Sequence, residues 1–121
     1  MRTRTEAEAM TDSRLPAHLE IGALIRLAEA SGGFATVLAK GERDAGTIVL
    51  VTIKNGADAQ LYERMPQLDG TRPWTITRTQ DSEKPQEFMQ YIQRRSAQDA
   101  DLWILEVDVA DPARFVETLS C

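Results

Sequence analysis

Residues 46–65 read GTIVLVTIKNGADAQLYERM, and this stretch decides the fold. Every side chain from Thr47 to Ile53 is apolar or β-branched. Because successive side chains of a strand point to opposite faces, such a strand needs cover on both faces and belongs inside a sheet. The Asn55-Gly56 pair that follows is typical of a type I′ turn, which requires positive φ at both middle residues. The sequence therefore predicts a central strand that returns through a tight hairpin, with its second arm at residues 60–65.

The rest of the chain shows the periodicities of three helices and three further strands. We expect helices at residues 15–33, 85–98 and from 111 onward, and strands at residues 34–40, 73–79 and 101–109. Strand 34–40 follows a glycine pair and is expected to be an antiparallel neighbour of the central strand. The short connections favour an α+β domain with a mainly antiparallel sheet of about five strands, helices packed on it, and the order α-β-β-β-β-α-β-α.

Strand 73–79 is expected at an edge of the sheet. Its residues alternate, with Trp74, Ile76 and Arg78 on one face and three threonines on the other. Proline has no backbone N–H to donate to a neighbouring strand, and a threonine face is compatible with contact with water. Both features suit an edge strand.

Composition is that of an ordinary one-domain globular protein. The chain has 121 residues, of which 42% are hydrophobic and 27% charged, and a formal charge of −5. We expect a flexible N-terminal tail at residues 1–14 and a single domain at residues 15–121. The chain has no membrane-spanning run, no signal-peptide pattern, and a single cysteine, Cys121, which cannot form an internal disulfide. These features predict a cytoplasmic protein, and the negative charge argues against general nucleic-acid binding.

The first expected helix is apolar around well over half of its circumference. A surface helix usually has a narrower apolar stripe. This helix is therefore either buried deep within its own domain or shared with a second subunit. For a shared helix, the expected interface residues are His18, Leu19, Ala23, Arg26 and Leu27.

Glu20 and Arg95 each place a full charge on an otherwise apolar helical arc. Burying either charge alone would cost several kcal/mol, so each needs a partner. We expect them to pair with one another or with Asp99, Asp101 or Glu106. A structural ion pair, or a long side chain that reaches water past the apolar rim, is the simpler interpretation. A charged pocket for a small ligand is the alternative, and it would use Arg95 and Glu106.

Arg43 and Asp44 lie in a polar loop bounded by Gly41 and Gly46, and Lys40 directly precedes it. Backbone amides beside glycines can bind an anion, and the two cations would support binding. The loop lacks the glycine and lysine spacing of a phosphate-binding or dinucleotide-binding loop. A solvated connection between strands is the simpler interpretation, and the three residues are kept as ligand-binding candidates.

Glu106, Asp108 and Asp111 gather near the end of the last strand. The first two would point the same way and could share a hard cation. However, Asp111 is already explained as the cap of a helix that begins at Pro112. We therefore expect no metal site, no cofactor and no catalytic residue, because the sequence also shows no nucleophile paired with a base.

Several short motifs are spread along the chain, namely Ile25-Arg26, a glycine pair, Lys40-Gly41 ahead of Asp44-Ala45-Gly46, Leu61-Tyr62, and Asp99-x-Asp101-Leu102-Trp103. Together they resemble the motifs of DUF1491, a bacterial family of short proteins of unknown function. The resemblance covers nearly everything after Arg14. It implies a bacterial, cytoplasmic, single-domain protein and supplies no catalytic residues.

Two functions from different classes follow from these observations. The first is a non-enzymatic interaction or assembly module that forms a homodimer, with a further protein partner left open, and the wide apolar arc of the first helix favours it. The second is a small-ligand-binding domain or enzyme that uses Arg95, Glu106 and the loop from Lys40 to Asp44. A pocket lined by those side chains would distinguish the second from the first.

Overall fold

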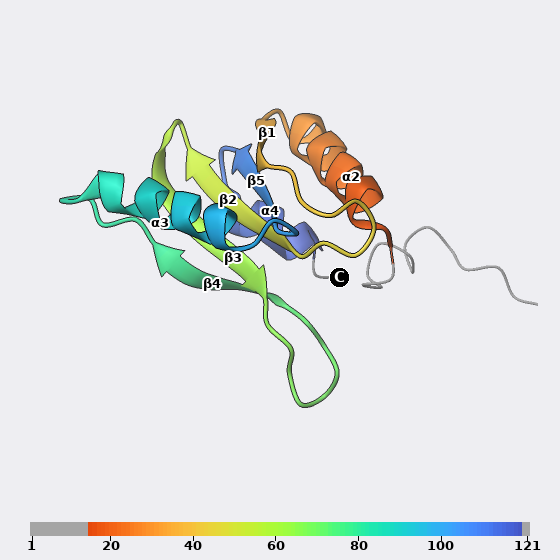
Figure 1. Cartoon of the computed structure of the whole chain (residues 1–121). Coiled ribbons are helices and arrows are strands. Elements are labelled where there is room, and N and C mark those ends of the chain that lie inside the picture. Colours follow the sequence, from red (N-terminus) through yellow and green to blue (C-terminus); the bar gives the residue numbers. More distant parts are fainter. Residues whose placement is uncertain (1–14, 120–121) are drawn as a thin grey trace, which may run out of the picture.

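The computed structural model describes residues 15–119, which form three helices and one five-stranded sheet (Figure 1). The expected tail and Cys121 lie outside the described residues. The predicted order of helices and strands is confirmed. The elements are α2 (Ala17–Ala30), β1 (Phe34–Ala39), β2 (Ile48–Lys54), β3 (Ala57–Arg64), β4 (Trp74–Thr79), α3 (Pro85–Gln98), β5 (Trp103–Asp108) and α4 (Pro112–Leu119).

Strand β2 is the middle strand of the sheet, as its composition predicts. Five of its seven residues, from Ile48 to Thr52, are buried. The turn that follows has φ of 52° at Asn55 and 76° at Gly56, which are the positive values that a type I′ turn requires. The hairpin with β3 is therefore confirmed.

The sheet is mixed, with the strand order β1-β5-β2-β3-β4. Strand β5 pairs in parallel with β2 and antiparallel with β1, so β1 is not a neighbour of β2 and that expectation is wrong. The physical reason is burial. Strand β5 is apolar on both faces over its first three residues, all buried, and takes an interior position, whereas four of the six residues of β1 are exposed. The helical connection through α3 permits the parallel pairing.

Each face of the sheet packs against its own helices (Figure 1). On one face, α2 and α4 pack on a core that includes Leu50, Leu105 and Phe115. On the other face, α3 contributes Phe88 and Ile92 to a second core with Val51, Leu61 and Ile104. One face thus has two helices and the opposite face has one.

Strand β4 forms an edge of the sheet, as expected, but its faces do not alternate regularly. Ile76 pairs with Tyr62 and Arg78 pairs with Leu61, so Thr77 is an extra residue that forms a bulge. The bulge moves Arg78 to the face covered by α3. The expectation that Trp74, Ile76 and Arg78 share a face is therefore wrong for Arg78.

Candidate functional site

Glu20 of α2 forms a buried ion pair with Arg64 at the end of β3. The guanidinium donates two hydrogen bonds to the carboxylate, of 2.6 Å and 3.1 Å, and the two side chains are 8% and 19% exposed for Glu20 and Arg64. Arg64 also stacks over the ring of Trp74, with its central carbon 4.6 Å from the ring centroid. The need of Glu20 for a partner is thus met within the domain.

Arg95 of α3 pairs with a different residue of the same strand, Glu63. Its guanidinium donates to Glu63 Oε1 at 2.9 Å and to the Tyr91 hydroxyl at 3.3 Å. Thr77 donates to the other oxygen of Glu63 at 2.5 Å, and Arg78 stacks 4.0 Å from the Tyr91 ring centroid. Burial alone would raise the pKa of Glu63, but the hydrogen bonds from Arg95 and Thr77 outweigh it and lower that pKa. The same hydrogen bond to Glu63 raises the pKa of Arg95.

The expected pairing of Glu20 with Arg95 is therefore wrong, and so are the other acidic partners considered for Arg95. Glu63 and Arg64 are consecutive residues of β3, so they point to opposite faces of the sheet. Arg64 reaches α2 and Glu63 reaches α3. Two adjacent charged residues at the end of a strand that is buried on both faces were the sequence signal for these partners.

The loop of residues 40–46 binds the carboxylate of its own Glu42. This carboxylate accepts hydrogen bonds from the backbone amides of Asp44, at 2.9 Å, and Ala45. The backbone carbonyl of Glu42 accepts a hydrogen bond from the indole of Trp103 at 2.7 Å. The amides that were expected to be available for an anion are thus used within the loop.

The same loop holds the beginning of α2. The amides of Ala17 and His18 donate to the backbone carbonyls of Asp44 and Arg43, each at 2.9 Å, and the His18 ring contacts the Arg43 carbonyl at 3.0 Å. Arg43 and Asp44 therefore contribute backbone carbonyls, and the Asp44 carboxylate also lies 3.9 Å from His18 Nδ1. Lys40, at the start of the loop, is exposed. A side chain at Gly41 or Gly46 would collide with the backbone carbonyl of Asp101, which explains both glycines.

Glu106 and Asp108 point to the same face of β5, as expected, and both are partly buried. Burial, and then the charge of Asp108, raise the pKa of Glu106. Asp108 accepts a hydrogen bond from the amide of Asn55 at 3.1 Å. Asp111 caps α4 by accepting a hydrogen bond from the Arg114 amide at 3.2 Å. Among residues 15–119, no group of three or more acidic, histidine or cysteine side chains is placed to bind a metal ion.

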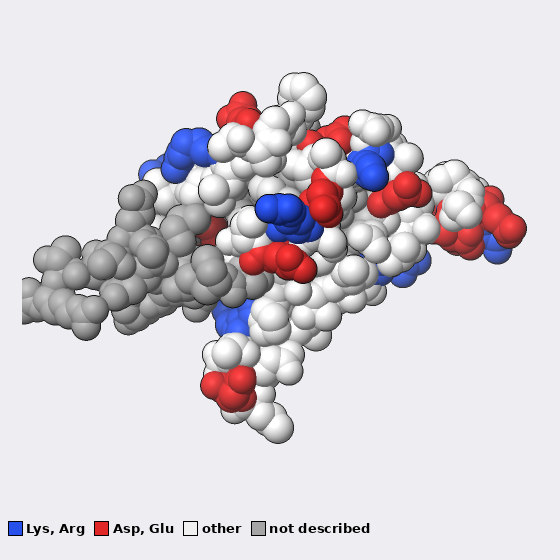
Figure 2. Space-filling view, turned by 180° about the vertical axis from the view of Figure 1, so that it is seen from behind, with Lys and Arg blue, Asp and Glu red and all other residues white. Residues whose placement is uncertain are grey.

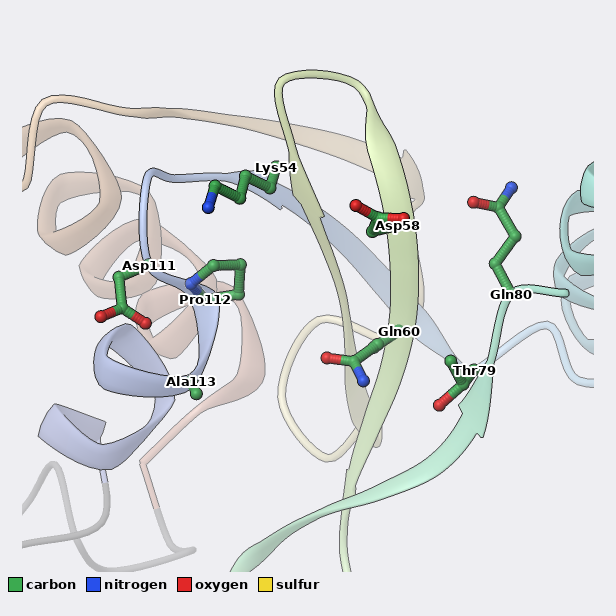
Figure 3. A pocket seen from close by; sticks show the side chains of 8 residues that line it. All are labelled: Lys54, Asp58, Gln60, Thr79, Gln80, Asp111, Pro112 and Ala113. Carbon is green, nitrogen blue, oxygen red and sulfur yellow. The ribbon is translucent and has the colours of Figure 1, made fainter. Parts of the chain in front are cut away.

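An open cavity of about 280 Å³ lies between the β2–β3 hairpin and the beginning of α4 (Figure 3). Most of its lining residues have polar or charged side chains, and they come from β2, β3, β4 and the beginning of α4, with Lys54, Gln60, Thr79 and Asp111 among them. None of the ligand-binding candidates from the sequence lines it. Among the described residues, no hydrogen bond or ion pair joins Arg95, Glu106 and the loop of residues 40–46 to one another.

The five expected interface residues lie on the outer side of α2. Leu19 is 50% exposed and Leu27 is 40% exposed, and Arg26 is exposed beside them. Ala23 and His18 are partly buried. The sheet-facing side is formed by the buried residues Ala17, Ile21, Leu24 and Ala28. The helix is thus not enclosed by the described part of its own chain.

Charge is mixed over the face that carries α4 (Figure 2). Acidic and basic side chains alternate across the visible surface, without a continuous basic stripe among the residues drawn in colour. None of the described helices is both long and apolar enough to span a membrane.

The comparisons with known proteins agree with this fold. The family model of DUF1491, described as a protein of unknown function, matches residues 15–117. No curated protein matches the chain.

Solved structures give the same result. A crystal structure of a DUF1491 family protein from Caulobacter crescentus has a TM-score of 0.70 and 30% identity, covering 84% of this chain and 94% of that chain. An NMR structure of a family protein from the same organism has a TM-score of 0.68 and 30% identity, covering 84% and 92%. A solution structure from A. tumefaciens has a TM-score of 0.64 and 28% identity, covering 81% and 88%. The chain therefore belongs to the DUF1491 family of proteins of unknown function.

Proposed function

We propose that this protein is a non-enzymatic interaction module that forms a homodimer through the outer stripe of α2, which consists of Leu19, Ala23 and Leu27. The observation that carries the proposal is the exposure of both leucines, at 50% and 40%. Exposed apolar side chains that line up on one element indicate a contact surface more strongly than scattered ones do.

The spacing of the stripe suits a helix-to-helix contact. Residues four apart form a ridge along a helix, and two such ridges pack into one another's grooves. The three residues span about 12 Å at about 1.5 Å per residue. Around a two-fold axis at Ala23, Leu19 of one subunit would meet Leu27 of the other, and the small alanine would let the helices approach. Each subunit would then contribute the same patch, as a two-fold interface requires.

The polar residues at the margin of the stripe fit this arrangement. Arg26 is exposed, and the ring of His18 contacts the backbone of Arg43. Interfaces commonly have an apolar centre and a polar rim that reaches water. A contact of one helix pair is at the small end of the range for specific interfaces, so we expect association in the micromolar range.

The test is the mass of the protein in solution, measured by sedimentation equilibrium. At tens of micromolar, we expect about twice the chain mass of 13.5 kDa. Leu27→Glu places an unpaired carboxylate against Leu19 at each end of the contact and should give a monomer. Met89→Glu is the matched control, because Met89 is an exposed apolar residue of α3 at 36% exposure, and it should leave the dimer intact. A wild-type monomer would overturn the proposal.

The ligand-binding alternative has less support. Arg95 is neutralised by Glu63, and the amides of the loop at residues 40–46 bind Glu42. A charged pocket requires its side chains to converge on one space, and these do not contact one another.

A further inference from the structure

The two faces of the sheet are covered unequally. On the face of α2 and α4, α2 packs on β1 and β5 and α4 packs on β2. On the opposite face, α3 packs on β2, β3 and the first half of β5. A helix about 10 Å wide covers about two strands at 4.8 Å spacing, so one helix cannot cover five strands. The position beside α3, over β1 and the end of β5, has no helix from the described part of the chain.

The residues at this position form what we call the open face, namely Phe34, Thr36, Glu106 and Asp108. Phe34 pairs with Asp108 and Thr36 pairs with Glu106 across β1 and β5, so all four point away from α2. Phe34 is 74% exposed, the largest value for an aromatic side chain on the described strands. Ile53, which pairs with Asp108 from β2, is partly buried at the margin.

Among residues 15–119, no cationic side chain lies within ion-pair distance of the two carboxylates of the open face. The described ion pairs involve Glu20, Glu63 and Asp44, and neither Glu106 nor Asp108 takes part in one. Burial and the neighbouring Asp108 already raise the pKa of Glu106, so its negative charge is poorly stabilised. A positive charge placed on this face would relieve that repulsion.

We propose that the open face binds an amphipathic helix of a partner protein, with apolar side chains on Phe34 and Ile53 and two basic side chains on Glu106 and Asp108. The spacing supports this occupant. Residues two apart on a strand are about 6.6 Å apart, and residues four apart on a helix are about 6 Å apart. The partner helix would therefore carry Lys or Arg at positions four residues apart, next to its apolar stripe. It would lie beside α3 and complete the layer on that face.

A second copy of this chain does not supply such a helix from its described residues. Helix α2 carries one arginine, Arg26, and α4 carries one, Arg114. The two arginines of α3 are adjacent in sequence, and Arg95 is bound to Glu63. None of these helices has basic residues three or four positions apart. A different protein is therefore the occupant that the charges fit.

The probe is a synthetic amphipathic peptide of about 18 residues, with leucines on one face and two lysines four positions apart at its margin. We would add it to the ¹⁵N-labelled full chain and follow the amide resonances. We expect saturable binding with shifts concentrated on β1 and β5. The double variant Glu106→Gln/Asp108→Asn should weaken binding about tenfold, which is 1.4 kcal/mol. It keeps the shapes of both side chains.

The matched control is Glu29→Gln/Glu117→Gln, which removes the same charge from exposed positions of α2 and α4. It should bind like the wild type. A peptide with glutamates in place of its lysines should not bind. Equal weakening by the two double variants would mean that only net charge matters and would overturn the proposal. Shifts centred away from β1 and β5, or no binding at millimolar peptide, would also overturn it.

Discussion

Replacing Arg64 with methionine should destabilise the fold by about 3 kcal/mol. The change leaves the carboxylate of Glu20, which is 8% exposed, without the two hydrogen bonds it receives. Breaking a buried ion pair by removing one partner costs about 3–5 kcal/mol. We take the lower end because the Arg64 side chain is 19% exposed, so water can reach part of the site.

Removing both charges should restore most of that stability. The double variant Glu20→Leu/Arg64→Met keeps the volume of the pair and continues the apolar arc of α2, so we expect a stability within about 1 kcal/mol of wild type. The single variant Glu20→Leu should be milder than Arg64→Met, since Arg64 keeps its stacking on Trp74 and its access to water.

Urea unfolding followed by tryptophan fluorescence and circular dichroism measures these differences. Arg78→Met is the matched control, because Arg78 is an exposed arginine that stacks on Tyr91 without an acidic partner among the described residues, and its loss should cost less than about 1 kcal/mol. A cost of Arg64→Met as small as that of this control would refute a stabilising role for the buried ion pair. A double variant as unstable as the sum of the two single variants would refute it too.

Three further outcomes can be checked by the same unfolding measurements. Thr52→Val should raise stability by about 1 kcal/mol, because Thr52 is fully buried and its hydroxyl has no hydrogen-bond partner among the described residues. As a control, Thr36→Val on the open face should change stability by less than about 0.5 kcal/mol. The lowered pKa of Glu63 adds stability that is present above its ordinary value of 4.5 and is lost as the pH falls through the folded value, so Glu63→Gln should flatten the acid side of the stability profile. Glu106 has a raised pKa in the folded state, so its ionised form lowers stability near neutral pH, and Glu106→Gln should be at least as stable as wild type at pH 7, by a margin below about 1 kcal/mol.

The fold was largely predictable because its decisive signals are local. The periodicity of β2, the Asn55-Gly56 turn and the cap at Asp111 each depend on a few adjacent residues, and each is confirmed. The position of β5 was not predicted. The place of β5 between β1 and β2 depends on residues far apart in the sequence, whereas the short loop after β1 favoured an antiparallel pairing of β1 with β2. The apolar residues on both faces of β5 were the signal for an interior strand.

The sequence predicted that two charged residues need ion-pair partners, but it did not identify those partners. Glu20 and Arg95 were each expected to need an opposite charge, and each has one. Their partners, Arg64 and Glu63, were not considered, although they lie next to one another at the end of β3. Alternation along that strand sends them to opposite faces. Similarly, no local rule located the bulge at Thr77, because it depends on how β4 aligns with β3.

The exposed stripe of α2 was predictable because the apolar arc of this helix is wider than the surface of the sheet that it covers. A helix with an apolar arc wider than the surface it covers leaves apolar residues in water unless another surface meets them. Leu19 and Leu27 are those residues in the described part of the chain. The homodimer remains a prediction that rests on them.

The most direct test is the concentration dependence of the molecular mass, measured for the wild type and Leu27→Glu from about 1 µM to about 100 µM, the range in which a small interface dissociates. We predict that the wild-type mass rises toward twice 13.5 kDa while the variant stays at 13.5 kDa throughout. A wild-type protein that keeps the mass of one chain at the highest concentration would contradict the account, as would a Leu27→Glu variant that dimerises as readily as the wild type.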